Sequence, residues 1–465
     1  MAINKLPDEV LLGIFGFCMA NPLPPPSYEE DAWHTLVHVC RRWRYVVFGS
    51  PGSLDLRLLC MNRRLVKPPD IWPELPIVIH VDNEKICQQP SVTNVISVLK
   101  RHDRVCKIFI DGVPNPLLEQ LATMREPFPA LIELELASFK EDPPILPDSF
   151  LGGSVPRLRS LILWGIPFPA IGKLLLSTRD LVTISLGFIP SSGNISPEAM
   201  VTILSTLTRL KSLHLSFESP QLWTQGASQR PPATRVVLPA LTAFDFSGNS
   251  QYLEDMVSRI DAPLDFLAAT VAYNPDQLVF DFPLLRHFIG RTKILNAPHR
   301  AVTSFSNCNA RIQLFRRKGG VDCHVLNLAI PCYASDLQPS ALAQACSSLS
   351  LPLPSLEHLS IYKFKSWVWL PRWQNVEITH WQWMVLLHPF ITVKDLVLDE
   401  PVVLSVASAL QELIAVGVTE ILPALQNIFL EGFRSSGPVP EGIARFIAVR
   451  ELSGRPVIVH FRETK

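Results

Sequence analysis

The sequence predicts an α/β protein in which a small all-α N-terminal domain precedes a repeat solenoid with a parallel sheet. Three observations carry this prediction. The first fifty residues contain two short apolar patterns with helical spacing. From about residue 105 onward the pattern L-x-x-L-x-L returns nine times, where L stands for any large apolar residue. Helix-like segments fall between the returns, as expected when each unit supplies one strand and one helix.

The first apolar pattern begins at Pro7 and predicts a helix start. Proline costs nothing in the first helical turn, because its missing N–H would have had no partner there. Asp8 and Glu9 then place negative charge near the positive end of the helix dipole. The apolar residues that follow recur at helical spacing: Val10, Leu11, Ile14 and Phe15. A second helical pattern runs from about Trp33 to Val47, and two helices this short need another surface to cover their apolar faces.

Together these two patterns resemble the F-box in both halves and in the right order. The first half is Leu6-Pro7-Asp8-Glu9 with Ile14-Phe15, and the second is Val39-Cys40-Arg41-Arg42-Trp43-Arg44. In that family the module docks on the Skp adaptor of a cullin-based ubiquitin ligase, and the rest of the chain selects the substrate. The resemblance implies adaptor binding at seven positions: Leu6, Pro7, Ile14, Phe15, Val39, Cys40 and Trp43.

The connection between the two halves departs from the F-box pattern. Residues 21–32 are longer and richer in proline than the usual connection. Proline fixes its own φ and disfavours the helical region for the residue before it, so an extended loop is expected here. This loop favours an alternative function, a protein-interaction scaffold without coupling to a ligase.

The nine repeats resemble irregular leucine-rich repeats, such as those common in F-box proteins and in expanded fungal F-box families. The first group starts at Val105, Leu131, Leu158, Leu181, Leu210 and Leu241, and the second at Leu356, Val393 and Leu425. Starts within the first group lie roughly 23–31 residues apart, close to the 20–29 of leucine-rich repeats. A weaker unit, Leu285-x-x-Phe288, lies between the groups, and no unit carries the asparagine that usually follows the third leucine.

The predicted order of domains follows from these patterns. It comprises an F-box at 1–50, a connector and start of the array at 51–103, repeat units at 104–261, irregular strand-rich units at 262–355, and C-terminal units with a cap at 356–465. For the irregular stretch two interpretations stay open. It is either a degenerate part of the same solenoid with long insertions, or a separate small domain.

In a solenoid of this type the variable strand positions line the face where partners bind. Seven acidic residues occupy those positions against a single lysine, although the formal net charge of the chain is zero. The hypothesis is therefore an acidic surface that prefers a basic segment of a substrate protein. The competing interpretation is that acidic residues merely decorate exposed strands. The candidate substrate-binding residues are Glu133, Glu135, Trp164, His214, Asp245, Tyr362, Asp395 and Asp399.

Composition excludes several other classes of function. A neutral chain lacks the basic excess of a nucleic-acid binder, and nine cysteines without any C-x-x-C pair argue against a zinc ribbon or a disulfide framework. No membrane-length apolar run and no secretory signal is apparent, so cytoplasm or nucleus is expected. Phosphate-binding glycine motifs and H-E-x-x-H are missing. We therefore expect no catalytic residue, no metal and no cofactor.

The predicted function is the substrate-recognition subunit of an SCF-type (Skp–cullin–F-box) ubiquitin ligase. The N-terminal helices bind the Skp adaptor and, through it, the cullin, while the repeats hold an unknown protein substrate. A third and weaker alternative is an enzyme whose site lies unrecognised within residues 262–355.

Overall fold

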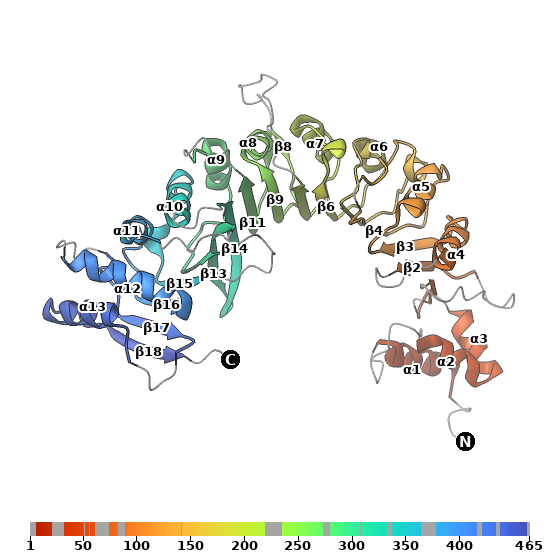
Figure 1. The fold of residues 1–465 in the computed structure, drawn as a ribbon. Helices are drawn as coiled ribbons and strands as arrows, with labels where there is room; N and C mark the ends of the chain where they lie inside the picture. Colours follow the sequence, from red (N-terminus) through yellow and green to blue (C-terminus); the bar gives the residue numbers. More distant parts are fainter. Residues whose placement is uncertain are drawn as a thin grey trace. The chain divides into compact units, whose positions relative to one another are not determined.

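The structure is a computed structural model of the 465-residue chain. It describes residues 6–20, 32–50, 52–54, 56–60, 74–81, 89–140, 142–218, 235–272, 280–306, 308–332, 337–363, 378–415, 421–433 and 438–462. The proline-rich connection at 21–31 lies outside these ranges. The chain forms two compact units, Met1–Leu210 and Lys211–Lys465, which are described in turn (Figure 1).

The first unit begins with three helices, α1 (Asp8–Ala20), α2 (Ala32–Val39) and α3 (Arg41–Gly49). The second helical pattern of the sequence is therefore two helices and not one. Cys40 separates them, because its backbone is extended (φ −159°, ψ 170°) and its Sγ accepts a hydrogen bond from the Trp43 N–H at 3.4 Å. Apolar periodicity runs through this break, so sequence spacing alone does not reveal it.

A parallel sheet follows the three helices. Its strands are β1 (Leu58–Cys60), β2 (Ile77–Val81), β3 (Val105–Ile110), β4 (Glu133–Ala137), β5 (Ser160–Trp164) and β6 (Thr183–Ile189). They lie side by side in chain order, and each neighbouring pair is parallel. Because β1 and β2 join this sheet, it begins within residues 51–103, before the first full repeat.

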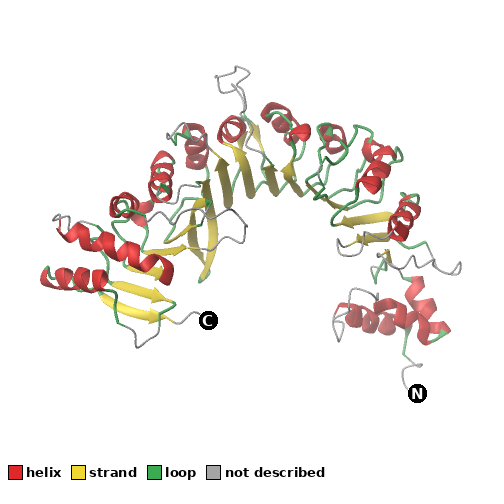
Figure 2. Cartoon of the chain, in the orientation of Figure 1, coloured by secondary structure: helices red, strands yellow, loops and turns green. Residues whose placement is uncertain are grey.

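Helices of the first unit cover one face of this sheet, as Figure 2 shows. They are α4 (Gln89–Leu99), α5 (Asn115–Thr123), α6 (Ile171–Leu176) and α7 (Pro197–Leu204). Short 3-10 helices lie between β4 and β5 (Phe150–Gly153) and between β6 and α7 (Ser191–Gly193). The repeated apolar residues of the strands point toward the helices and are buried; Leu134, Leu136, Leu161 and Leu163 are at most 1% exposed. Each such side chain contributes about 1.5–3 kcal/mol when fully buried, so stacking of units supplies the core that one unit lacks.

The second unit is built on a sheet in which nine of the ten strands run parallel. In spatial order the strands are β7 (Ser212–Phe217), β9 (Ala243–Asn249), β11 (Phe266–Ala272), β14 (Val321–Pro331), β13 (Asn309–Lys318), β12 (Arg300–Phe305), β15 (His358–Lys363), β16 (Asp395–Asp399), β17 (Asn427–Glu431) and β18 (Ile458–Arg462). Strand β13 is antiparallel to both neighbours. A separate two-stranded pair joins β8 (Val236–Val237) and β10 (Ile260–Asp261).

The irregular stretch at 262–355 continues this sheet. Strands β13 and β14 form a hairpin whose turn contains Gly319 and Gly320, with φ of 59° and 84°, conformations that glycine adopts without steric cost. The hairpin inserts β13 between β14 and β12, so the strand order no longer follows the chain. Strands β11, β12 and β14 otherwise pair parallel with their repeat neighbours.

One predicted repeat unit is wrong. Leu285 and Phe288 lie in helix α9 (Pro283–Arg291), where both face the core together with Ile289. Pro283 opens this helix, and apolar residues spaced by three and four positions form its buried stripe. The spacing L-x-x-L is common to a helix face and to the repeat motif, which is why the sequence misled here. A last strand, β18, was not predicted at all.

The remaining helices of the second unit again cover one face of its sheet (Figure 2). They are α8 (Ser250–Ser258), α10 (Gln338–Ser348), α11 (His380–Leu387), α12 (Glu400–Ala415) and α13 (Glu441–Leu452). In both units the sheet face opposite the helices carries the alternate, partly exposed residues of each strand. We call this the open face.

Candidate interaction surfaces

The predicted adaptor-binding residues divide into interior and exposed positions. Phe15 is 1% exposed, and its ring lies 4.7 Å from that of Trp43. Cys40 caps α3 through its sulfur. The ring contact holds α1 against α3, and Cys40 begins α3, so all three residues contribute to the packing of the domain. Whether they also contact an adaptor stays a prediction. Pro7, Ile14 and Val39 are exposed, while Leu6 is partly exposed.

Charge also joins the two halves of the motif. The Arg42 guanidinium at the start of α3 contacts the Asp8 carboxylate at the start of α1, with Nη2–Oδ1 at 2.6 Å and Nε–Oδ1 at 3.0 Å. The same guanidinium donates a hydrogen bond to the carbonyl of Leu6. Asp8 of the first half of the motif and Arg42 of the second half thus form an ion pair, which gives both residues a role in holding α1 and α3 together.

An apolar strip remains exposed on the same domain. Val10, Ile14 and Phe17 follow one another on one side of α1 at spacings of four and three residues, and are 46%, 38% and 71% exposed. Val39, at the end of α2, is 58% exposed. We name these four residues the α1 strip. The motif pointed to Ile14 and Val39, whereas Val10 and Phe17 were missed as surface residues, although their helical spacing from Ile14 signals a shared face.

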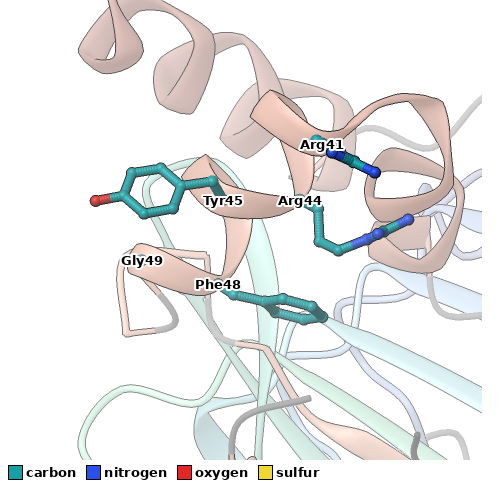
Figure 3. Close-up of a pocket in the computed structure, with 5 residues that line it drawn as sticks. All are labelled: Arg41, Arg44, Tyr45, Phe48 and Gly49. Atoms are coloured by element: carbon teal, nitrogen blue, oxygen red, sulfur yellow. The ribbon is translucent and has the colours of Figure 1, made fainter. Parts of the chain in front are cut away.

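A shallow hollow lies on α3, as Figure 3 shows. It encloses about 470 Å³ and is lined by Arg41, Arg44, Tyr45, Phe48 and Gly49. Arg41 and Arg44 extend to the same side, whereas Tyr45 points to the opposite side and is 75% exposed. The Nε of Arg44 donates to the carbonyl of Val37 at 3.0 Å, so this arginine also ties α3 to α2. None of these lining residues was predicted as a site.

On the open face of the first unit, the predicted substrate-binding residues lie directly beside residues of the neighbouring strands. Lys107, Glu133 and Ser160 are direct neighbours on β3, β4 and β5, and Glu135 lies beside Phe109 and Ile162. The Lys107 ammonium contacts the Glu133 carboxylate at 2.6 Å, so the single lysine is paired. A partly exposed pair of this kind contributes little to stability, about 0–1 kcal/mol, but it removes one negative charge from the face.

Glu135 is the acidic residue of this face with a shifted pKa. Burial raises its pKa above the ordinary value, and the negative charges of Asp111 and Glu133 raise it further, while His80 opposes them. His80 stacks on Phe109 with ring centroids 4.6 Å apart. Burial, the largest cause, and the neighbouring carboxylates therefore both disfavour the ionised form of Glu135.

Trp164 lies at the end of β5 on the same open face. Its indole covers Gly187 of β6 so closely that a Cβ built there would lie 2.8 Å from Cδ2. The ring of Phe188, which is 53% exposed, lies 5.5 Å from the Trp164 ring. Glycine at 187 therefore permits a flat aromatic platform beside the acidic positions.

On the open face of the second unit the acidic candidates pair with histidines. Asp245 on β9 lies 3.1 Å from Nδ1 of His214 on the adjacent β7. Asp395 on β16 lies 2.8 Å from Nδ1 of His358 on β15, and it also accepts a hydrogen bond from the Asn427 amide at 2.7 Å. In the sequence these acids look like available charge, but their partners come from neighbouring strands that are distant in the chain.

The last strands extend this polar ladder. His460 on β18 lies 3.3 Å from the amide oxygen of Asn427 and stacks on Phe429, with ring centroids 4.8 Å apart. The Arg462 guanidinium also lies over Phe429, 3.9 Å from the ring centroid, and is 3.9 Å from the Glu431 carboxylate. His460 and Arg462 were missed because β18 lacks the repeat pattern.

Tyr362 and Asp399 occupy the third row of the same face. Burial raises the pKa of Tyr362, and the neighbouring Glu431 carboxylate adds to the shift. Burial also raises the pKa of Asp399, opposed by the backbone N–H of Lys363, which donates to its carboxylate at 2.9 Å. Asp399 thus serves partly to fasten the end of β15 to β16.

Within the described ranges, no cluster of three or more His, Cys, Asp or Glu side chains is arranged to hold a metal ion. In the same part of the chain, no helix has both the length and the apolar character needed to cross a membrane. The absence of a catalytic residue, a metal or a cofactor stays a prediction.

Comparison with known proteins adds little. No protein-family model matches the chain, and no curated protein matches it. Among solved structures the chain is similar to the leucine-rich repeat-containing protein LegL7 from Legionella pneumophila, at 15% sequence identity and a TM-score of 0.28. The similarity covers 74% of this chain and 97% of that chain. The strand pairing described above establishes a mixed α/β fold with a large parallel sheet, independently of this likeness.

Proposed function

We propose that the chain is the substrate-recognition subunit of an SCF-type ubiquitin ligase, with the N-terminal helices as its adaptor-binding module. The observation that carries the proposal is the α1 strip. Helix α1 already buries Leu11 and Phe15 inside the domain, yet it presents a second apolar row to solvent. A domain of three short helices gains nothing from such a row unless a partner covers it.

The Skp adaptor is the partner that this row fits, on the strength of the F-box resemblance. The residues of the resemblance build the three helices, through the Phe15–Trp43 ring contact and the Asp8–Arg42 ion pair. The same fold then displays Ile14 and the other α1 strip residues outward. Contacts that maintain the domain and contacts that bind the adaptor are therefore separate sets of side chains.

The test is adaptor binding by the full chain after substitution of exposed residues only. Ile14→Glu with Phe17→Glu puts two charges on the α1 strip and leaves the buried side chains of Leu11 and Phe15 unchanged. Leu404→Glu on α12 is the matched control, because Leu404 is 70% exposed and lies in the other unit. The proteins are co-expressed with a Skp adaptor and recovered by a tag on the chain, and the circular dichroism of each is compared.

The wild-type chain and the Leu404→Glu variant are expected to recover the adaptor at equal yield. The double variant is expected to lose at least nine-tenths of it, because burying a charge in an apolar contact without a partner is strongly unfavourable. Two results contradict the proposal. In the first, the double variant recovers the adaptor at wild-type yield. In the second, none of the proteins recovers the adaptor. The second result favours the interaction scaffold without ligase coupling.

A further inference from the structure

The open faces of the two units differ in which carboxylates have partners. Asp245 and Asp395 contact histidines in the second unit, and Glu133 contacts Lys107 in the first. Glu135 on β4 and Asp111, just after β3, form no hydrogen bond or ion pair through their side chains among the residues that the structure describes. These two carboxylates are therefore available negative charge on the open face of the first unit.

These two carboxylates lie near each other on the same side of the sheet. Asp111 continues the exposed alternation of Lys107 and Phe109 on β3, and its charge acts on Glu135. Burial and like charge raise the pKa of Glu135, so its ionised form is under strain. A cation placed between the two carboxylates would stabilise the ionised form of Glu135, so this site is complementary to a positively charged group.

The aromatic platform is within reach of the same cation. Trp164 is two residues beyond Ile162, the direct neighbour of Glu135 on β5. With strands about 4.8 Å apart and two residues spanning about 6.6 Å, the Glu135 and Trp164 backbones are separated by about 8 Å. A long cationic side chain spans that distance, with its charge at the carboxylates and its stem or planar group on the indole.

We propose that the open face of β3–β6 binds a partner segment through an arginine that contacts Asp111 and Glu135 and stacks on Trp164. Arginine fits better than lysine, because its planar guanidinium both pairs with carboxylates in a bidentate manner and stacks on aromatic rings. The exposed ring of Phe188 beside Trp164 accommodates an apolar residue next to that arginine. This inference rests on the proposed function in one respect: in the ligase, the segment belongs to the substrate.

The experiment uses the full chain and a randomised peptide array, with arginine-containing peptides as probes. Wild-type protein is expected to enrich arginine next to an apolar residue. The best peptide is then resynthesised with lysine, or with citrulline, in place of arginine. Citrulline keeps the shape and removes the charge, so we expect at least tenfold weaker binding. The lysine peptide is expected to bind with intermediate affinity.

Two variants of equal charge change complete the design. Asp111→Asn with Glu135→Gln is expected to lose at least tenfold in affinity for the arginine peptide. Asp103→Asn with Glu119→Gln is the control, because both residues are exposed and lie away from the open face, in a turn and on α5. Equal binding of the arginine and citrulline peptides, absence of arginine enrichment, or equal loss in both variants overturns the proposal.

The outcome is separable from that of the proposed function. Both charge variants retain the α1 strip, so adaptor recovery is expected at the wild-type level in each. Loss of arginine recognition with adaptor recovery intact confirms the assignment of this surface. Arginine recognition by a chain that recovers no adaptor contradicts the ligase proposal alone, and adaptor recovery without arginine enrichment contradicts this inference alone.

Discussion

Glu254 provides the sharpest test of how neighbouring repeat units are held together. It lies on α8, is 6% exposed, and accepts hydrogen bonds from the N–H groups of Leu284 and Leu285 at 2.8 and 2.7 Å. These groups belong to the first turn of α9, whose own N-cap residue, Phe282, supplies no side-chain hydrogen bond. Within the second unit, the Glu254 carboxylate of one repeat therefore caps helix α9 of the next repeat.

The perturbation is Glu254→Gln, which keeps the size and removes one acceptor. Each N–H contacts a different carboxylate oxygen, so the amide leaves one buried N–H without a partner. An unsatisfied buried donor costs about 1–3 kcal/mol, and the lost interaction of the charge with the helix dipole adds about 0.5 kcal/mol. We expect the free energy of unfolding of the second unit to fall by about 1.5–3.5 kcal/mol in total.

The pH dependence checks the sign of this account. Burial raises the pKa of Glu254 above 4.5, although the two N–H donors oppose it. The folded state thus retains a proton that the unfolded state has released, so the contribution of Glu254 to stability decreases as pH rises from about 4.5 through the folded pKa. Because glutamine does not titrate, the stability difference between wild type and variant is expected to shrink over that window.

Urea denaturation measures the free energy of unfolding, and a separate hydrogen-exchange experiment measures protection of the α9 amides. Glu451→Gln on α13 is the control, because Glu451 is exposed. Faster exchange at Leu284 and Leu285, absent from the control, is the expected local signature. Unchanged exchange there refutes the capping role. A stability difference that grows with rising pH contradicts the raised pKa of Glu254.

Three further predictions concern packing and reactivity. Gly442→Ala is expected to lower the free energy of unfolding by about 1–3 kcal/mol, because the added Cβ would lie 2.5 Å from the carbonyl oxygen of Ala407 and push α13 from α12; thermal melts against wild type measure it. Burial raises the pKa of the Cys346 thiol to about 12. When native protein is treated with iodoacetamide at about pH 8, the reagent is therefore expected to alkylate the exposed Cys18 and to leave Cys346 unmodified. Peptide mass spectrometry measures both, and equal labelling of the two cysteines contradicts the prediction. Phe15→Ala removes a fully buried ring and is expected to cost about 3–5 kcal/mol, seen as early proteolysis within the N-terminal helices; unchanged proteolysis refutes the ring contact as their support.

The repeat pattern predicted most of the strands for a physical reason. Apolar residues at L-x-x-L-x-L must face one core, and a strand presents alternate residues to one face, so the pattern fixes both the strand and its buried side. Leu134 and Leu136 are buried as this reasoning requires. It failed at Leu285, where the same spacing fits one face of a helix, and at β18, where the spacing is lost although the strand pairs normally with β17.

The candidate surfaces depended far more on tertiary structure. Glu133 and Glu135 look equivalent in sequence. Within the described part of the chain, however, only Glu133 forms an ion pair, because Lys107 lies opposite it on the next strand. In the N-terminal domain, Ile14 and Phe15 are adjacent in the motif, but the helix directs one outward and the other into the core. Pairing between strands and the direction of side chains on a packed helix are properties that no local pattern contains.

The sequence by itself determined most of the strands, the buried side of most repeats, and a neutral chain whose strand faces are rich in carboxylates. Those features follow from local periodicity and composition. Only the tertiary structure decided which carboxylates have partners on neighbouring strands, how the 262–355 stretch enters the sheet, and which apolar residues of the first helices stay exposed. Each of these depends on contacts between residues far apart in the chain, and such contacts form only when the units stack.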